Sequence, residues 1–436
     1  MTLVSSFLEF VQQVSFIMTA PTFDTLVTVL TGWVFARRHT VTGAILAADA
    51  VGTKHHSSFH RLFAKAEWHL DELGLAVFGL MLRWVRSDLI LLAIDDTLAR
   101  KRGLKIYGVG MHHDPMISTR KVARLNWGHS WVVLSVIVRF PFCSDRCFAL
   151  PILFRLYVNK QTVAKKGGWY RTRPELAVEM LYLLCRAYKN RRFHVVADST
   201  YGGQSILGDL PENCDLTSRL DLDARLYNAP PARKPGTNGR PRKRGQRLPS
   251  PRQMLTGRAH RRTLNIYGRR DKVRMTDCVG RVHAVPDRPL RVVAVEPLTG
   301  GRKEQAFYST RHEASAEQVL TWYAMRWSIE VAFQSSKTHL GFEEPQGWTR
   351  RAVERTAPTA MLLYTLIVLW FARYGHRRYC QPDRPWYRTK RYASFADMLT
   401  TLRRESIREQ VLSTPTFGRG HRKVLRTLLH AVQQAA

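Results

Sequence analysis

The stretch LILLAIDD, residues 89–96, is a continuous apolar run that ends in two acids. A run of this length and composition predicts a buried strand with its carboxylates at the edge of a sheet. The stretch FHVVADSTYGG, residues 193–203, has the same form, and its apolar part ends at Asp198. We therefore expect two buried strands, each of which ends on an acid.

The segments around these strands complete an α/β pattern. Apolar runs predict further strands at 131–140 and 147–158, and residues 174–188 predict a helix with Pro174 in its first turn. Strands that alternate with helices are typical of an α/β core. The chain has 436 residues, more than one compact core usually accommodates, so we expect two or three domains.

Residues 1–88 precede this core and are predicted to be all-α. They include one short helix at 42–50 and a second helix that begins near Ser57 or Ser58, either of which can cap it. The second helix carries basic side chains, namely His60, Arg61 and Lys65. This outline is typical of a helix-turn-helix that contacts DNA. The alternative is an ordinary helical pair with a solvated basic face.

Residues 205–312 are predicted to be a β-rich insertion that carries a basic loop. Between residues 233 and 274 there are 15 Lys or Arg and a single acid, Asp271. The loop is also rich in Gly and Pro, which favours an irregular segment. Its densest basic run contains Arg240, Arg242, Lys243 and Arg244. Contact with phosphates explains such a cluster, and a solvated linker is the alternative.

The charge of the whole chain indicates a polyanionic partner. There are 68 Lys plus Arg against 34 Asp plus Glu, a formal net charge of +34. A protein this basic repels itself unless it meets a polyanion, and neutralising phosphates drives binding to nucleic acid. Hydrophobic residues make up 45% of the chain, which excludes a wholly disordered protein.

Other classes of protein fit less well. The six cysteines include no C-x-x-C pair, so they are expected to be reduced thiols and not a zinc site. The N-terminus lacks a positive region before its apolar residues, as a signal peptide would have. The apolar run 360–372 is shorter than the roughly 20 residues that span a bilayer. We expect a cytoplasmic protein, with no membrane partner, in which this run forms a buried helix.

The helix predicted from Ser315 to Gly341 carries the most specific pattern. Tyr323, Arg326, Glu330 and Lys337 stand at i, i+3, i+7 and i+14, which places them on one helical face. On this interpretation Glu330 binds metal and has no ion-pair partner one turn away. Arg326 and Lys337 are then free to bind phosphates on either side of the reacting bond.

Three acids, on the two predicted strands and the predicted helix, are suited to phosphodiester chemistry. They are Asp95, Asp198 and Glu330, with Asp96 as the alternative to Asp95. Carboxylates are the hard oxygen ligands that hold two Mg²⁺ ions, which activate the attacking group and stabilise the leaving oxygen. Asp95 and Asp96 point to opposite faces of a strand, so only one of them can face this site.

The helix pattern resembles a known family signature. Tyr323-x2-Arg326-x3-Glu330-x6-Lys337 matches the Y-x2-R-x3-E-x6-K signature of bacterial insertion-sequence DDE transposases. AIDDTLARKRG at 93–103 and VVADSTYGG at 195–203 resemble the strands that carry the first and second aspartates of that family. The D-x-T spacing to Thr97 favours Asp95 over Asp96.

The resemblance implies a fold and an activity. The fold would be an RNase H-like catalytic core, at 89–204 and 313–380, interrupted by the β-rich insertion and followed by a basic region at 381–436. The activity would be cleavage at transposon ends and strand transfer by the freed 3′-hydroxyl. It would need two Mg²⁺ ions, with Mn²⁺ able to substitute. The partners would be double-stranded DNA at the terminal inverted repeats and the target, and a second copy of the chain, in the bacterial nucleoid.

Several interpretations stay open at the level of sequence. A transposase-derived DNA-binding factor without activity and a stand-alone RNase H-like nuclease are the competing functions. Some relatives process ends through a DNA hairpin with an aromatic wedge in the insertion, but residues 201–321 contain no Trp. We expect His112, His113 and Asp114 to be structural or to contact DNA, not to bind a catalytic metal. Trp348 and Arg350 are expected either to approach DNA or to pack.

Overall fold

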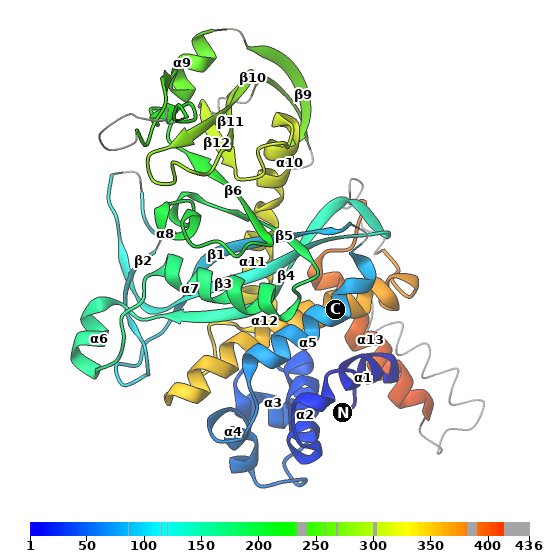
Figure 1. The fold of residues 1–436 in the computed structure, drawn as a ribbon. Helices are drawn as coiled ribbons and strands as arrows, with labels where there is room; N and C mark the ends of the chain where they lie inside the picture. The colour runs from blue at the N-terminus through cyan, green and yellow to red at the C-terminus, as the bar shows by residue number, and fades with distance from the viewer. Residues whose placement is uncertain are drawn as a thin grey trace.

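The two strands predicted to end on acids are neighbours in a computed structural model of the chain (Figure 1). The prediction is wrong for the first strand, which continues past Asp95 and Asp96 to Arg100 because it stays paired with a neighbouring strand over this length. β1, Leu89–Arg100, runs parallel to β5, Arg192–Ala197, with Ile94 opposite Ala197. Their central side chains are buried, as the apolar runs predict. The structure describes residues 1–85, 87–114, 116–119, 121–232, 242–257, 259–266, 269–299, 303–381 and 390–413.

These strands belong to one mixed sheet. Among the described residues it has 12 strands, in the order β2-β3-β1-β5-β6-β12-β11-β10-β7-β8, with β4 paired to β3 and β9 paired to β10. The remaining strands are β2 Gly110–His113, β3 Leu125–Phe140, β4 Cys143–Tyr157, β6 Cys214–Leu220, β7 Leu226–Tyr227, β8 Arg247–Leu248, β9 His260–Ile266, β10 Arg269–Val282, β11 Leu290–Pro297 and β12 Gln305–Ser309.

The central part of the sheet combines antiparallel and parallel pairs. β1, β3 and β4 are antiparallel neighbours, while β5 and β6 continue the sheet parallel to β1. β12 then pairs with β6, so the strands of the insertion extend the same sheet. The boundary predicted at residue 205 therefore falls between β5 and β6, which are partners. The insertion also has its own apolar cluster, formed with the helix that follows it.

Helices cover both faces of the central strands. α7 contacts β3 and β4, whereas α11 contacts β1 and β4 and α12 also packs on β4 (Figure 1). The helices are α1 Ser5–Gln12, α2 Ala20–Phe35, α3 Val41–Ala47, α4 His56–Ala64, α5 Leu70–Met81, α6 Lys160–Lys166, α7 Arg173–Ala187, α8 Gln204–Leu207, α9 Pro251–Thr256, α10 Ala316–Met325, α11 Trp327–Leu340, α12 Arg350–Arg373 and α13 Phe395–Ser413, with short 3-10 turns at Ser15–Ile17, Leu82–Trp84, Ser199–Tyr201 and Gly375–Arg377.

The region before β1 is helical, as predicted, but one helix cap differs. α3 and α4 pack on each other and on α2. The prediction that Ser57 or Ser58 caps the second helix is wrong. α4 begins one residue earlier, and the ring nitrogen of His55 accepts a hydrogen bond from the Ser57 backbone N–H. An imidazole acceptor replaces the expected hydroxyl, because the chain turns before the serines.

The helix predicted from Ser315 to Gly341 is two helices. α10 and α11 are separated by Arg326, whose backbone stays in the right-handed helical region at φ −51° and ψ −37°. The predicted ends are confirmed. Ser315 caps α10 by accepting from the Gln318 N–H, and Gly341 ends α11 at φ +55°, where a Cβ would lie 2.5 Å from the His39 Cβ.

The long helix α12 is the apolar run predicted to be buried. It is long and apolar enough to cross a membrane by length and composition, but its apolar window is wholly buried within the protein. It packs on α4, α5, α11 and β4, and Thr365 donates to the Pro151 carbonyl at 2.9 Å. α13, which the sequence did not predict, packs against α12, α11 and α2, and its Ser406 hydroxyl accepts from the Val4 N–H.

Candidate active site

Arg326, at the junction of α10 and α11, lies among the three predicted acids. Its Nη1 donates to Asp95 Oδ2 at 2.5 Å and its Nη2 donates to Glu330 Oε1 at 3.0 Å. Its charge also interacts with that of Asp198. One guanidinium therefore links a strand acid to a helix acid, and it is only 14% exposed.

Asp95 and Asp198 are held beside each other by the sheet. Because Ile94 pairs with Ala197 in parallel register, the acids that follow them occupy equivalent places on neighbouring strands. Asp198 also caps the turn after β5 by accepting from the Thr200 N–H at 2.9 Å. Sheet register thus brings together two acids that are distant in the sequence.

The environment of Asp95 opposes its ionisation. Burial raises the pKa of Asp95 from 3.8 to about 7, and the charges of Asp96 and Asp198 add to this increase, while Arg326 lowers it. Burial also raises the pKa of Glu330, again against the effect of Arg326. Carboxyls that a cation stabilises only in part are typical of functional sites.

Asp96 faces the opposite side of β1, as expected for consecutive strand residues. Its Oδ1 accepts from the Tyr201 hydroxyl at 2.9 Å, and its Oδ2 pairs with Arg173 Nε at 3.3 Å. Arg173 is the first residue of α7 and also donates to the Ser130 hydroxyl. The two adjacent acids therefore have separate partners on separate faces.

The donor chemistry of the site suits a divalent metal. Asp95, Asp198 and Glu330 supply carboxylate oxygens, the ligands that Mg²⁺ prefers. Within the described part of the chain, however, no three His, Cys, Asp or Glu side chains are close enough to hold a metal ion together. Arg326 lies between Asp95 and Glu330 and satisfies both charges. The residues are therefore of the right type for the metal, while in this conformation Arg326 occupies the space between two of them.

The ion pair of Glu330 corrects one expectation from the sequence. Glu330 does have a partner one turn away, because Arg326 at i−4 binds it. The interpretation that Arg326 projects freely toward phosphates is therefore wrong for this conformation. The short separation along the helix favours the pair, and Asp95 holds the other side of the same guanidinium.

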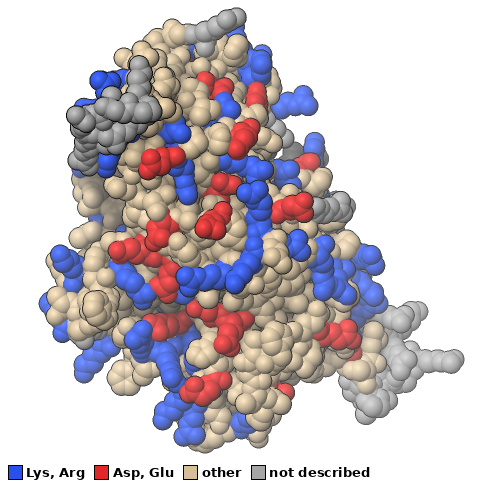
Figure 2. All heavy atoms as spheres, in the orientation of Figure 1, with Lys and Arg blue, Asp and Glu red and all other residues tan. Residues whose placement is uncertain are grey.

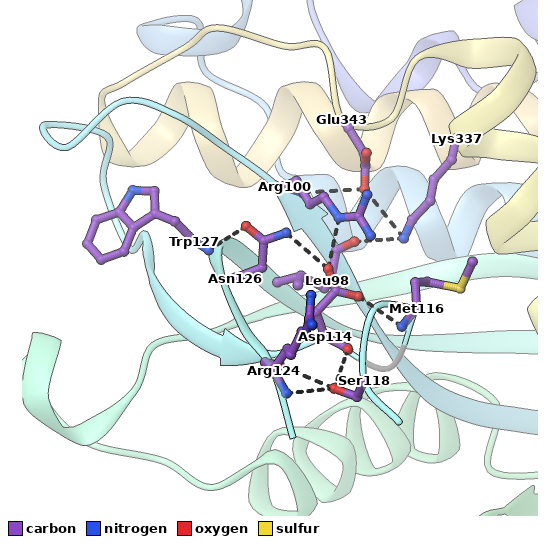
Figure 3. Close-up of polar contacts among 10 residues, drawn as sticks. All are labelled: Leu98, Arg100, Asp114, Met116, Ser118, Arg124, Asn126, Trp127, Lys337 and Glu343. Carbon is purple, nitrogen blue, oxygen red and sulfur yellow. Dashed lines mark hydrogen bonds and ion pairs between the residues drawn. The ribbon is translucent and has the colours of Figure 1, made fainter. Parts of the chain in front are cut away.

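Lys337, the last member of the helix pattern, packs against the end of β1. Its Nζ donates to the Leu98 carbonyl at 2.7 Å and lies 3.5 Å from Glu343 Oε1 (Figure 3). Glu343 also accepts from the Arg100 backbone N–H. The helix face predicted from the spacing exists, but it is turned toward β1 and not toward open solvent.

Tyr323 lies at the other end of this face, inside the apolar cluster of the insertion. It is 7% exposed, its ring packs on Phe307 with centroids 4.5 Å apart, and the Arg326 guanidinium lies 5.7 Å from its ring. Its ring therefore joins the insertion to Arg326. Tyr323, Arg326 and Glu330 come together as the spacing predicts, while Lys337 lies farther along β1.

The His112–Asp114 segment is structural in this conformation. Figure 3 shows Asp114 at the centre of polar contacts, where it accepts from Arg100 Nε at 2.8 Å, Asn126 Nδ2 at 3.1 Å and the Met116 N–H at 3.0 Å. These bonds keep the pKa of Asp114 low although burial raises it. His112 is buried, which lowers its pKa to about 4.

The other predicted DNA-binding residues are separated from these acids along the chain. The described ones among them lie on the surface. His60 and Arg61 are exposed on α4, and Arg242, Lys243 and Arg244 are exposed beside β8. Arg240 lies outside the described residues. Figure 2 shows Lys and Arg side chains from one end of the visible face to the other, with Asp and Glu side chains interspersed among them.

Arg173 and Tyr201 are neighbours of the site that the sequence did not indicate. Arg173 precedes Pro174 in a helix start with a Thr172–Glu175 capping box, a pattern that has an ordinary structural meaning. Tyr201 belongs to the DSTYGG motif, but nothing in the motif indicates that its hydroxyl reaches β1. Only the sheet order brings these side chains to Asp96.

Comparisons with known proteins identify the family of the chain. The family described as DDE superfamily endonuclease matches residues 19–277, more than half of the 436 residues, and this range contains Asp95 and Asp198. A probable transposase for insertion sequence element IS701 from Microchaete diplosiphon is 26% identical over 170 residues. That alignment covers 38% of this chain and 40% of the relative, so the two match over less than half of the relative's length. This chain belongs to the DDE superfamily endonucleases, with an insertion-sequence transposase among its relatives.

Proposed function

We propose that this protein is a DNA transposase that binds the terminal inverted repeats of its element, cleaves DNA at the ends and joins the 3′-hydroxyl to target DNA. The observation that carries the proposal is the contact of Arg326 with Asp95 and Glu330, beside Asp198. Asp95, Asp198 and Glu330 all interact with this one cation, and carboxylates are the ligands that metal-assisted phosphodiester cleavage uses.

Asp95, Asp198 and Glu330 are proposed as the metal ligands, with Asp96 as the alternative to Asp95. Two Mg²⁺ ions bound there would activate the attacking oxygen and stabilise the leaving one. Arg326 would then leave the carboxylates and become available to a DNA phosphate, for which its planar fork is suited. Lys337 would add a second cation near the end of β1.

The sheet supports an RNase H-like core for this activity. The order β4-β3-β1-β5-β6, with three antiparallel strands followed by two parallel ones, is the strand order of that fold. The first two acids lie on the neighbouring strands β1 and β5, and Glu330 lies on a helix that contacts β1. The insertion between them then serves as an arm that extends the sheet.

DNA binding is proposed to involve two surfaces of each chain. α4 would contact the terminal repeats through His60 and Arg61, which are exposed. The basic run that includes Arg242, Lys243 and Arg244 would contact phosphates next to the cleavage site. Two copies of the chain would hold the two ends of one element.

The test is cleavage of a labelled duplex that carries the DNA flanking the coding sequence. We expect Mg²⁺-dependent nicking at the repeat boundary, followed by joining of the new 3′ end to a second duplex. A stand-alone nuclease would cut without respect to the repeat, and a binding factor without activity would bind the repeat and leave it intact. Either result would contradict the proposal.

A further inference from the structure

A hollow of about 640 Å³ lies between three separate segments, and none of the proposed catalytic acids lines it. Its walls are Tyr107 from the loop after β1, Trp169 from the loop before α7, and Arg350 and Glu354 at the start of α12. Leu156 and Leu176 form part of its apolar lining. Nothing in the proposed chemistry uses this hollow.

Hydrogen bonds fix one wall of the hollow. The Tyr107 N–H donates to the Trp348 carbonyl at 2.9 Å, and the Tyr107 carbonyl is 2.8 Å from His129 Nε2. Lys101 Nζ donates to the carbonyls of Glu343 and Pro345. The loop after β1 and the segment before α12 are therefore fastened together, so the hollow is a built feature.

Two tryptophans, one in the wall of the hollow and one beside it, are exposed to an unusual degree. Trp169 is 95% exposed and Trp348 is 65% exposed. A side chain of this size gains free energy when a partner covers it, so an exposed pair suggests a contact surface. Trp169 follows Gly167 and Gly168, whose φ angles of +77° and +118° favour glycine and set the direction of the chain at this position.

Charges at the hollow indicate the kind of partner. Arg350 lies 5.7 Å from the Tyr107 ring and pairs with Glu354 at 3.1 Å. Arg171, which pairs with Glu179, lines the hollow next to Trp169. Aromatic rings beside cations bind nucleotides, because a base stacks on the ring while the cation attracts the phosphate. The faces of bases in a duplex are already stacked, so the partner that fits is an unpaired nucleotide.

The hollow is close to the candidate active site along the chain. Arg173, four residues after Trp169, pairs with Asp96 at 3.3 Å. Four residues of extended chain span at most about 14 Å between Cα atoms. Trp169 therefore lies within a short length of chain of Asp96, on the face of β1 opposite to Asp95.

We propose that this hollow binds an unpaired base of single-stranded DNA, stacked on Trp169. The proposal rests on the proposed function for the origin of that strand, but binding itself needs no cleavage. Glu354 gives the hollow a preference, because its carboxylate accepts hydrogen bonds from the amino group of cytosine or adenine. Thymine has no such donor.

The experiment measures binding of the full chain, in EDTA, to a labelled duplex that is either blunt or extended by a short single strand of cytidines or thymidines. We expect the cytidine extension to raise the affinity of the unaltered chain about tenfold over that for the blunt duplex. Trp169→Ala should remove this gain and leave the affinity for the blunt duplex unchanged. Trp169→Phe should keep part of the gain. Phe16→Ala, which removes another exposed ring far along the chain, is the matched control.

The preference is tested in the same assay. Glu354→Gln should narrow the difference between cytidine and thymidine extensions, since an amide also offers a donor. Equal affinity of the unaltered chain and Trp169→Ala for the extended duplex would overturn the proposal, as would an equal loss for blunt and extended duplexes. Because no metal is present, these results are independent of whether the protein cleaves DNA.

Discussion

Arg326 donates through Nη1 to Asp95 Oδ2 at 2.5 Å, joining the start of α11 to the middle of β1 across 231 residues of sequence. The same guanidinium holds Glu330 with its other amino group. A partly buried cation therefore occupies the space between two acids that are proposed to bind metal. The consequences of this contact can be measured without DNA.

Arg326→Ala is expected to lower the stability of the protein without metal and to increase the stabilisation that Mg²⁺ provides. Without the guanidinium, Asp95 and Glu330 lose their shared ion-pair partner and remain beside a third carboxylate, Asp198. The free energy of unfolding should therefore fall by about 1–3 kcal/mol in EDTA. Mg²⁺ should then raise the melting temperature more than it does for the unaltered chain. Arg252→Ala, at an exposed ion pair, is the control. Equal Mg²⁺ responses of Arg326→Ala and the unaltered chain would count against this role of Arg326.

The raised pKa of Asp95 predicts a dependence of metal binding on pH. Since its pKa is about 7, the carboxyl holds a proton below that value, and Mg²⁺ affinity should fall as the pH falls through 7. Calorimetric titration at several pH values measures this. Asp95→Asn should abolish binding, and an affinity that does not change between about pH 6 and 8 would contradict the assignment.

Stability without metal should change in the opposite direction. The native protein holds the Asp95 proton more tightly than the unfolded chain, whose carboxyl has the ordinary pKa of 3.8. The contribution of this proton to stability is therefore complete at acid pH and is lost as the pH rises from about 4 to 7. Urea unfolding of the unaltered chain and Asp95→Asn in EDTA, compared across this range, isolates the effect. If the difference between the two proteins did not vary with pH, the raised pKa would be wrong.

Replacing Asp95 and replacing Asp96 should have different effects on cleavage and on stability. Asp95→Asn removes a proposed ligand and should abolish cleavage, whereas the amide oxygen of Asp96→Asn can still accept from Tyr201, so this variant should retain activity within about tenfold. Asp96→Asn should instead lower stability, because the charge that pairs with Arg173 is lost. Single-turnover cleavage and thermal unfolding of both variants decide between the acids. Loss of cleavage in Asp96→Asn alone would make Asp96 the ligand.

The basic helix α4 should contribute to binding of the repeat through phosphates and bases. Replacing Arg61 by Ala should weaken duplex binding and reduce the slope of log affinity against log salt by about 1. Arg192→Ala, at the start of β5, is the matched control because it removes the same charge from another exposed position. An unchanged slope for Arg61→Ala would show that Arg61 does not contact DNA phosphates.

The sequence predicted the elements better than their arrangement. Apolar runs identified β1, β3, β4 and β5, because strands buried on both faces need continuous hydrophobic residues. The pairing of β12 with β6 could not be predicted, since register between distant strands depends on the whole sheet. α13 escaped prediction because its buried residues alternate with many charged ones.

The sequence predicted which residues form the candidate site but not the contacts between them. Helical spacing placed Arg326 near Glu330, because residues four apart are neighbours on any helix. The spacing could not show that Asp95 would attract the same guanidinium away from solvent. Arg173 was missed for the same reason, since its partner Asp96 becomes a neighbour only when α7 packs on the sheet.

The most direct test of the account compares the unaltered chain with Asp198→Asn and Glu330→Gln on a labelled duplex that carries the flanking repeat. These changes keep the size of each side chain and remove its charge. The account predicts that both variants bind the repeat with unchanged affinity and produce no cleavage in Mg²⁺. Normal cleavage by either variant would contradict the claim that these carboxylates, with Asp95, form the active site.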